Sequence, residues 1–293
     1  WGGGGGGGVF GASGGGKSSL IKVLACLKRA NAGEVYWQGL RVDNLSEGKL
    51  RPWRHLVQVV FQEPGSSFNP RHTVGFALRE ALHRPKTRLG KDAVCERERL
   101  AQLFSLVGLP FSEEMLARRI FEFSGGQRQR LSLVRALAAE PKVLLLDEPV
   151  ASLDVPVRRR FLDSLAELVP STGLAVLLVT HDLNILDGLA RRVVVLLSGR
   201  VVEEGPWAEV KRSPLHPYTR ALLDATEDVL RWQRFFLPAP SGCPFRLACP
   251  WASAACLAEP HPQACRGRRV ACFHPLIGNI SREKLVQTQR EGG

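Results

Sequence analysis

The sequence has no run of about eighteen apolar residues, the length that a helix needs to cross a bilayer, so no part of it is expected to span a membrane. Methionine is almost absent as well. The single one is Met115, and the chain begins at Trp1 with no secretory signal pattern. We therefore expect the sequence to be a fragment that lacks its natural N-terminus.

Acidic residues are in short supply: 28 Asp and Glu stand against 40 Lys and Arg, which gives a net charge of +12. This positive charge favours nucleotides, nucleic acid or anionic lipid as partners, but an arginine-rich genome produces the same balance. Charge alone therefore does not identify the partner. Hydrophobic residues at 44% and charged residues at 23% exclude a disordered or fibrous chain. The 293 residues can bury one substantial core and carry a small accessory region.

Strand-length apolar runs rich in Val and Leu predict buried parallel strands. They are Val143–Leu146, Leu174–Val179 and Val193–Leu197. Strands and helices alternate from Val143 to Gly205, which predicts a parallel α/β sheet. Upstream, Gly33–Val42 alternates polar and apolar residues, as an antiparallel strand pair does.

The pattern turns helical between about Asn69 and Glu140. Helices are predicted at Ala93–Leu106, Glu113–Arg119 and Gln127–Ala139, the last with its apolar residues on one face. After Gly205 the chain becomes rich first in Pro and then in Cys. We therefore predict an α/β core from residues 1–68 and 140–205, a helical subdomain at 69–139, and a small Cys-rich C-terminal tail at 206–293.

Residues 11–18 read GASGGGKS, a full match to the phosphate-loop pattern GxxxxGK[ST]. Glycines let backbone N–H groups converge on phosphate oxygens, while Lys17 reaches the β- and γ-phosphates and the Ser18 hydroxyl ligates Mg²⁺. A chance match is the alternative in so glycine-rich a stretch. The predicted nucleotide-binding residues are Gly11, Ala12, Ser13, Gly14, Gly15, Gly16, Lys17, Ser18 and Ser19.

Two carboxylates follow the apolar run Val143–Leu146. At the end of a buried strand, Asp147 can hold the Mg²⁺ shell, and Glu148 can polarise the water that attacks the γ-phosphate. A surface Asp-Glu pair at a strand end is the alternative. The phosphate loop in the same chain favours the catalytic interpretation.

Upstream of these carboxylates, Phe123-Ser124-Gly125-Gly126-Gln127 forms a glycine turn that opens a helix, and its free N–H groups and the Ser124 hydroxyl can bind phosphate. With this motif the chain resembles the ABC transporter ATPase family from Val9 onward, with Phe123 where Leu is more common. The resemblance implies a P-loop NTPase (RecA-like) core, a helical signature subdomain, and hydrolysis of ATP with Mg²⁺. It also implies a signature that faces the γ-phosphate held by the opposite subunit of a head-to-tail dimer, namely Ser124, Gly125, Gly126 and Gln127.

Further family motifs occur in the expected order. Gln62 resembles the Q-loop residue that senses Mg²⁺ and couples to the membrane partner. His181 resembles the switch histidine at the γ-phosphate, although a lone His after an apolar strand is usually structural. The D-loop, which crosses the dimer interface, is matched by Ser152, Leu153 and Asp154. The aromatic residue that stacks on adenine in this family is expected upstream of the observed start.

Two segments resemble the oligopeptide, dipeptide and nickel importer branch: the extended Q-loop Phe61–Arg71 and the HPYT string His216–Thr219. The branch implies an ATPase subunit that powers uptake of peptides, or related solutes such as nickel, across the inner membrane. Its implied partners are a second homologous ATPase subunit, two transmembrane permease subunits and, indirectly, a solute-binding protein, with no nucleic acid. The chain would lie peripherally on the cytoplasmic face of that membrane.

Of the seven cysteines, five lie between Cys243 and Cys272. In a cytosolic protein such a cluster favours a metal over disulfides, and four thiolates suit zinc or an iron–sulfur cluster. The resemblance favours [4Fe–4S], with Cys265 outside the ligand set and reduced, empty thiols as the alternative. The implied ligands are Cys243, Cys249, Cys256 and Cys272. Because the tail lies beyond the predicted core, we expect ATP binding to survive loss of the cluster.

Other functions share much of this motif set. One is an accessory ATPase of a carbon–phosphorus lyase system. Another is a soluble ABC protein that acts on ribosomes or DNA, which the basic charge would suit. Soluble members usually carry two cassettes or a long insertion, and neither is found in this sequence.

Overall fold

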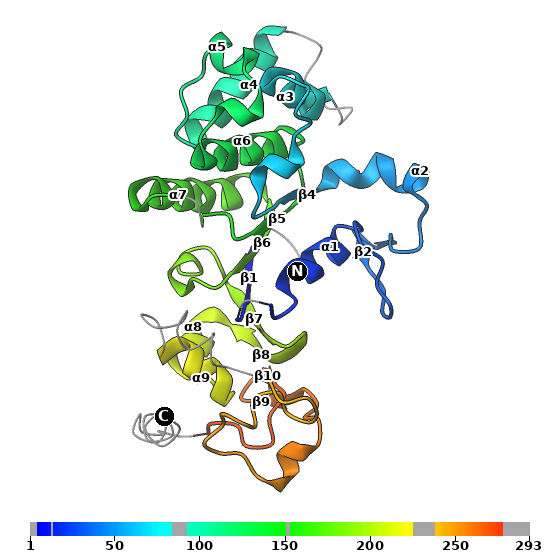
Figure 1. The fold of residues 1–293 in the computed structure, drawn as a ribbon, viewed down its shortest axis with the longest axis vertical. Coiled ribbons are helices and arrows are strands. Elements are labelled where there is room, and N and C mark those ends of the chain that lie inside the picture. The colour runs from blue at the N-terminus through cyan, green and yellow to red at the C-terminus, as the bar shows by residue number, and fades with distance from the viewer. Residues whose placement is uncertain (1–4, 13, 84–92, 151–152, 225–237, 278–293) are drawn as a thin grey trace. The chain divides into compact units, whose positions relative to one another are not determined.

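Figure 1 shows the computed structural model of the chain, which describes residues 5–12, 14–83, 93–150, 153–224 and 238–277. By its internal contacts the chain divides into two units. The first comprises Trp1–Gly7 and Ser18–Val179, and the second comprises Gly8–Lys17 and Thr180–Gly293. The chain passes between the units within strand β1 (Gly6–Phe10), at the start of helix α1 (Lys17–Leu24) and at the end of strand β6 (Ala175–Thr180).

The first unit combines strands with most of the helices. Its other strands are β2 (Tyr36–Trp37), β3 (Leu40–Arg41), β4 (Val57–Val60) and β5 (Val143–Asp147). Its α-helices after α1 are α2 (Glu47–Leu50), α3 (Val74–His83), α4 (Ala93–Leu106), α5 (Glu113–Ala117), α6 (Gly125–Ala138) and α7 (Val155–Thr172). Its 3₁₀-helices are η1 (Arg51–Leu56), η2 (Pro64–Ser67) and η3 (Ile120–Glu122).

Strands β4, β5 and β6 form the parallel sheet of the first unit. Val60 lies opposite Leu146, and Leu146 lies opposite Leu178. Leu144 and Leu146 are fully buried. Strands covered on both faces are typically near-continuous runs of Val and Leu, as these are. The parallel pairing confirms the sequence prediction of a parallel sheet for these strands.

The first unit also contains the predicted antiparallel pair. Strands β2 and β3 pair across Gln38 and Gly39, whose φ angles are 50° and 81°. Positive φ at both positions matches the right-handed twist of a two-residue hairpin. The Trp37 indole N–H donates to the carbonyl of Leu24 over 3.0 Å, which ties the hairpin to the end of α1.

The helices of the first unit follow the predicted pattern closely. Helix α4 has the predicted bounds, α5 ends earlier than predicted, and α6 begins two residues earlier. Helices α3 and α4 both pack on α6. Leu78 of α3, Phe104 of α4 and Leu131 of α6 are fully buried in this arrangement.

The second unit is built on antiparallel strands. They are β7 (Arg192–Leu197), β8 (Arg200–Pro206), β9 (Gln263–Cys265) and β10 (Arg268–Val270), in the order β7-β8-β10-β9. Its helices are η4 (Leu183–Ile185), α8 (Trp207–Arg212), α9 (Pro217–Asp224) and η5 (Ala254–Leu257). All three strand pairings in this order are antiparallel.

The sequence prediction of a parallel sheet up to Gly205 is wrong at β8, which runs antiparallel to β7. Strands β7 and β8 form a hairpin because Ser198 and Gly199, with φ angles of 50° and 77°, make a tight turn. A parallel neighbour would need a crossover of about a dozen residues, which this connection lacks. Strand β10 then pairs with β8, so the sheet continues past the boundary predicted after Gly205.

Candidate nucleotide-binding site

The phosphate loop, residues 11–17, connects β1 to α1. Gly14 and Gly16 have φ angles of 76° and 91°, a left-handed conformation that costs strain for a residue with a side chain. The Gly15 N–H donates to the carbonyl of Ala12 over 3.2 Å and closes the turn. Ser13 lies outside the described residues. The described part of the loop is a backbone-lined turn that leads into a helix, as the motif predicts.

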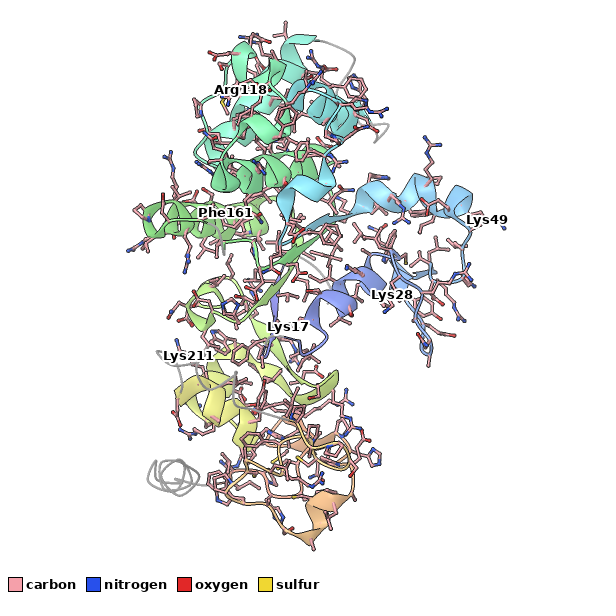
Figure 2. The ribbon with its side chains drawn as sticks, in the orientation of Figure 1. Lys17, Lys28, Lys49, Arg118, Phe161 and Lys211 are labelled. Carbon is pink, nitrogen blue, oxygen red and sulfur yellow. The ribbon has the colours of Figure 1, made fainter. Side chains whose placement is uncertain are left out.

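Lys17 occupies the first position of α1 (Figure 2) and is buried, with 7% of its surface exposed. Its ammonium donates to the carbonyl oxygens of Gly11 over 2.8 Å and of Ala12 over 2.9 Å. Phosphate oxygens are stronger acceptors for an ammonium than neutral carbonyls are. A phosphate that enters the loop can therefore replace these two carbonyl oxygens as the hydrogen-bond acceptor of the Lys17 ammonium. Ser18 and Ser19 follow in the first turn of α1, half-buried and exposed respectively.

The phosphate loop is supported by other parts of the second unit. The Gly199 N–H, in the β7–β8 turn, donates to the carbonyl of Gly15 over 3.0 Å. A Cβ atom at Gly11 would stand 2.1 Å from the carbonyl oxygen of Leu196, so only glycine fits there. The Tyr218 hydroxyl accepts the Ala12 N–H over 2.9 Å. A loop without side chains at these glycines fits a nucleoside triphosphate, whose phosphates need close approach of the backbone.

Tyr218 is not among the site residues predicted from the sequence, where the HPYT string indicates only the importer branch. A fully buried tyrosine far along the chain has no local pattern that ties it to a phosphate loop. Its hydrogen bond to Ala12 became visible only in the folded chain.

Asp147 and Glu148 lie at the carboxyl end of β5, where the sequence predicted them. Asp147 is 4% exposed and Glu148 is 9% exposed. The Glu148 N–H donates to the carbonyl of Val179 over 2.9 Å, and Glu148 has a φ angle of 50°. A left-handed conformation at a residue other than glycine stores strain, which is frequent at functional sites. The structure therefore holds Glu148 in one orientation at the strand end.

Gln62 follows β4 by two residues and is exposed. Because Val60 of β4 pairs with Leu146 of β5, the parallel register brings Gln62 to the same sheet edge as Asp147. His181 comes directly after β6 in the second unit and is half-buried. The strand register thus places Gln62 and the two carboxylates at one edge of the sheet in the first unit.

The signature motif forms the N-terminus of α6. The Ser124 hydroxyl accepts the Gln127 N–H over 3.3 Å, and Gln127 Oε1 accepts the Ser124 N–H over 2.9 Å. This reciprocal arrangement is a capping box. Ser124 and Gly125 are exposed, so the helix start faces solvent in the isolated chain. Gln127 thereby has a local structural role, while its predicted contact across a dimer stays a prediction.

The D-loop motif leads into α7. Asp154 is the N-cap of this helix, and its carboxylate accepts the Val157 N–H over 3.0 Å. Leu153 is buried, and its N–H donates to the carbonyl of Val150 over 3.1 Å. Ser152 lies outside the described residues. The predicted contact of the D-loop with a second subunit is not tested by a single chain.

The four cysteines of the predicted metal site are largely buried. Burial raises the pKa of the Cys249 thiol to about 11 and that of Cys272 to about 12. The pKa of Cys272 is raised further by Cys249, Cys243 and Cys256, whereas Cys265 makes no such contribution. Within the described residues, no group of three or more His, Cys, Asp or Glu side chains is arranged to hold a metal ion. The structure therefore does not support the metal site, and the ligand set stays a prediction.

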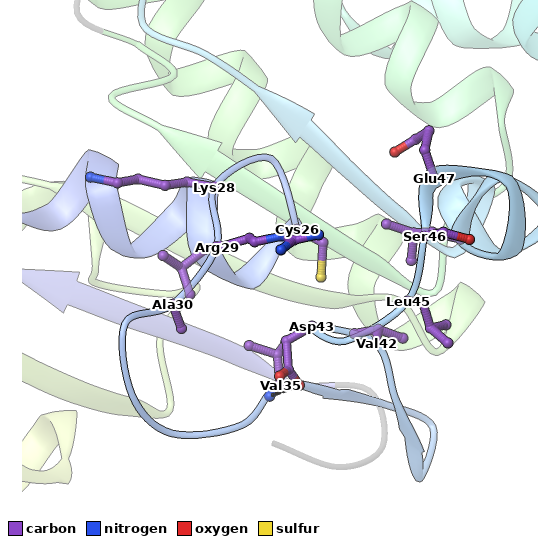
Figure 3. A pocket seen from close by; sticks show the side chains of 12 residues that line it. Cys26, Lys28, Arg29, Ala30, Val35, Val42, Asp43, Leu45, Ser46 and Glu47 are labelled. Carbon is purple, nitrogen blue, oxygen red and sulfur yellow. Dashed lines mark hydrogen bonds between the residues drawn. The ribbon is translucent and has the colours of Figure 1, made fainter.

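A separate cavity of about 200 Å³ lies in the first unit (Figure 3). It is bounded by the end of α1 and by the chain from Val35 to Leu50, with Cys26, Lys28 and Asp43 among its lining residues. Burial raises the pKa of Cys26. The cavity contains none of the predicted nucleotide-site residues, so it adds nothing to the site.

Comparison with known families agrees with this geometry. Residues 4–151 match the ABC transporter family, and residues 202–256 match the C-terminal region of oligopeptide/dipeptide transporters. The chain therefore belongs to the ABC transporter family as an ATPase cassette, which confirms the predicted P-loop NTPase fold, and ATP with Mg²⁺ is the cofactor that the family uses. Within the family, it carries the C-terminal region of the oligopeptide/dipeptide branch.

Individual relatives place the chain in the same group. It is 39% identical over 271 residues to the probable peptide ABC transporter ATP-binding protein y4tS of Sinorhizobium fredii, which covers 87% of this chain and 75% of that protein. It is 42% identical over 209 residues to the glutathione import ATP-binding protein GsiA of Salmonella paratyphi A, covering 71% of this chain and 33% of that protein. The chain thus spans only about a third of the length of GsiA.

A solved structure shows the same fold. The dimeric ATP-binding cassette MJ0796, in a post-hydrolysis state with ADP and Pi, superposes with a TM-score of 0.61 at 28% identity. The match covers 70% of this chain and 86% of that chain.

Proposed function

We propose that the chain is the ATP-hydrolysing subunit of an importer that takes up peptides. The observation that carries this proposal is the joint presence of a phosphate loop with Lys17 on its carbonyls and an oligopeptide/dipeptide-type region at residues 202–256. The test is ATP hydrolysis by the complex reconstituted with its permease subunits in vesicles, with and without peptides. Stimulation by peptides supports the proposal. Hydrolysis that no peptide changes, in a complex that carries another solute, would contradict it.

In the proposed reaction each named side chain has one task. Lys17 would bind the β- and γ-phosphates, and the Ser18 hydroxyl and the Asp147 carboxylate would hold Mg²⁺, which neutralises phosphate charge. Gln62, at the same sheet edge as Asp147, would be a further Mg²⁺ ligand. Glu148 accepts a proton from the attacking water, and His181 stabilises charge on the transferred phosphoryl group.

We also propose that the cassette works as a head-to-tail dimer with a homologous ATPase, docked on two permease subunits that receive solute from a solute-binding protein. The start of α6, where Ser124 and Gly125 are exposed, supports this idea because a helix N-terminus attracts phosphate. Within the described ranges no helix is long and apolar enough to cross a membrane. We propose that the permeases of such an importer hold the chain peripherally at the cytoplasmic face of the inner membrane.

The dimer makes a specific prediction about two defective variants. Ser124→Arg should still bind ATP on its own phosphate loop but lose hydrolysis, whereas Lys17→Ala should lose binding. When two copies of this chain pair in the reconstituted complex, mixing the variants should restore turnover, because one composite site then contains both intact halves. The measurement is the rate of phosphate release by each variant and by the mixture. Full-rate turnover by a verified monomer would exclude the dimer.

The cysteine tail yields a second prediction. We propose that Cys243, Cys249, Cys256 and Cys272 bind a [4Fe–4S] cluster, or zinc. Burial raises the pKa values of Cys243, Cys249 and Cys272, and Cys256 raises each of them further, which supports the choice of set. Anaerobically purified protein should be brown with about four irons per chain. Cys249→Ser should bleach it, and Cys265→Ser, the matched control, should not. Colourless protein with one zinc per chain would identify the metal as zinc rather than iron. Metal-free protein with freely titrating thiols would contradict the metal site.

A further inference from the structure

Tyr218 is fully buried in the second unit, and its hydroxyl accepts the N–H of Ala12 in the phosphate loop. The two residues are separated by 206 positions in the chain. Burial raises the pKa of Tyr218 to about 12, so the phenol stays neutral at physiological pH. This hydrogen bond fixes the direction of the Ala12 N–H, and with it the start of the phosphate-loop turn.

The segment before Tyr218 is itself fixed by hydrogen bonds to a buried carboxylate. Leu215 and His216 donate their N–H groups to the two oxygens of Glu203 on β8, each over 2.9 Å. The Tyr218 N–H donates to His216 Nδ1 over 3.0 Å. Complete burial lowers the pKa of His216 to about 3, so the ring is neutral and Nδ1 can accept. The start of α9 is therefore rigidly joined to β8.

A buried ion pair adds a third element to this support. Arg268 on β10 donates to Glu203 over 3.2 Å, and both side chains are almost entirely buried. Arg268 also donates to the carbonyl of Ser213 over 2.7 Å. Charges buried this deeply persist only when paired and hydrogen-bonded, so the geometry is strongly specified.

Two contacts extend this support to the cysteine segment, residues 242–272. The Phe245 ring, two residues after Cys243, meets Tyr218 edge to face with 5.6 Å between ring centroids. Arg200, next to Gly199 in the turn that touches the phosphate loop, donates to the carbonyl of Gly242 over 2.8 Å. Arg200 also pairs with Glu259 over 2.9 Å. The phosphate loop is thus connected to the cysteine segment in two ways: through the ring contact of Tyr218 with Phe245, and through the hydrogen bond from Arg200 to Gly242.

We propose that Tyr218 is a positioning residue for the phosphate loop, and that through Phe245 and Arg200 the cysteine segment sets the affinity of the loop for ATP. This inference rests on the proposed ATPase function. ATP binding is still expected to survive loss of the cluster, and the inference adds that the affinity for ATP depends on a physical connection between the tail and the loop. A loop pre-arranged by fixed hydrogen bonds loses less conformational entropy when phosphate binds.

Removal of the single hydroxyl tests the first step. In Tyr218→Phe the ring contacts remain, but the Ala12 N–H loses its acceptor. A part-buried donor left unsatisfied is costly, so we expect the Kd for Mg–ATP to rise about tenfold while kcat at saturating ATP changes little. The measurement is titration of the full chain with a non-hydrolysable ATP analogue, followed by KM and kcat of the reconstituted complex.

The chain offers a matched control because it contains just two tyrosines. Tyr36 is 55% exposed and bonds Glu34 on the hairpin surface, so Tyr36→Phe makes the same chemical change away from the loop. It should leave Kd unchanged. If the wild type itself fails to bind ATP, the proposed function fails. If the wild type binds and Tyr218→Phe binds within twofold of it, the positioning role is overturned.

The route through the hairpin is tested separately. Arg200→Gln removes the bonds to Gly242 and Glu259, and we expect about a threefold rise in Kd. The control is Arg192→Gln on the same hairpin, whose partner is Glu204 at the surface. Equal affinities for Arg200→Gln and Arg192→Gln would overturn the link to the cysteine segment.

Hydrogen exchange of the wild type keeps the inference testable even if Tyr218→Phe does not fold. The Ala12 amide should exchange slowly in the nucleotide-free protein, because its N–H is held by Tyr218. Fast exchange at Ala12, at the rate of an exposed loop amide, would overturn the role of Tyr218 without any variant.

Discussion

Replacing Glu148 with Gln should leave ATP bound and lower the rate of hydrolysis by roughly a hundredfold or more. The amide has nearly the same shape as the carboxylate but cannot accept a proton from the attacking water. Because Glu148 is held at the end of β5 by its N–H bond to Val179, the substitution should not change the fold. The measurement pairs ATP affinity of the chain with single-turnover hydrolysis in the reconstituted complex.

Glu140 provides the control for this experiment. It also has a left-handed φ angle, 49°, and it is exposed just before β5. Glu140→Gln therefore reproduces the chemical change and the backbone setting outside the site, and it should hydrolyse ATP at the wild-type rate. Hydrolysis by Glu148→Gln near the wild-type rate would remove Glu148 from the mechanism.

Gly11→Ala should weaken ATP binding by about a hundredfold, since forcing a methyl into a packed position costs about 1–3 kcal/mol and each 1.4 kcal/mol is about tenfold in affinity. The new Cβ would stand 2.1 Å from the carbonyl oxygen of Leu196, a backbone atom that cannot rotate away. Either the phosphate loop or the β7–β8 hairpin must shift. The measurement is the Kd for Mg–ATP, together with the melting temperature to show that the variant folds.

Gly33→Ala separates this steric effect from ordinary backbone strain. Gly33 has a φ angle of 84°, and a Cβ there would meet nothing within 4 Å. The substitution should cost about 1–2 kcal/mol of stability through its left-handed backbone and leave ATP affinity unchanged. If both variants bind ATP as the wild type does, the close approach of Gly11 to Leu196 is not required for binding.

Some predicted residues lie where the sequence placed them. They belong to short motifs whose residues are neighbours in the sequence. Lys17 lies at the start of α1 because the glycines that form the loop end at Gly16 and residues that favour a helix follow them. Asp147 lies at a strand end because four apolar residues precede it. The capping box at Ser124 needs only a residue three positions later. Local spacing specifies such features, and the chemistry of phosphate and Mg²⁺ limits which residues can occupy them.

The features that sequence analysis missed involve distant parts of the chain. The direction of β8 depends on the turn at Ser198 and Gly199, whose conformation an apolar run does not reveal. The pairing of β10 with β8 joins residues far apart in sequence. The arrangement of the four cysteines likewise depends on loops such as the one in which the Cys243 N–H donates to the carbonyl of Cys256 over 3.0 Å.

The sequence by itself therefore determined the family, the phosphate loop, the two carboxylates at the end of β5 and the signature helix, because each is encoded by residues that are neighbours in the chain. Only the tertiary structure decided that Tyr218 supports Ala12 and that Arg200 joins the loop to the cysteine segment. These contacts form when burial brings together residues that no periodic pattern relates. Hydrogen bonds of this kind are specified by the packing of whole elements rather than by the spacing of side chains along one of them.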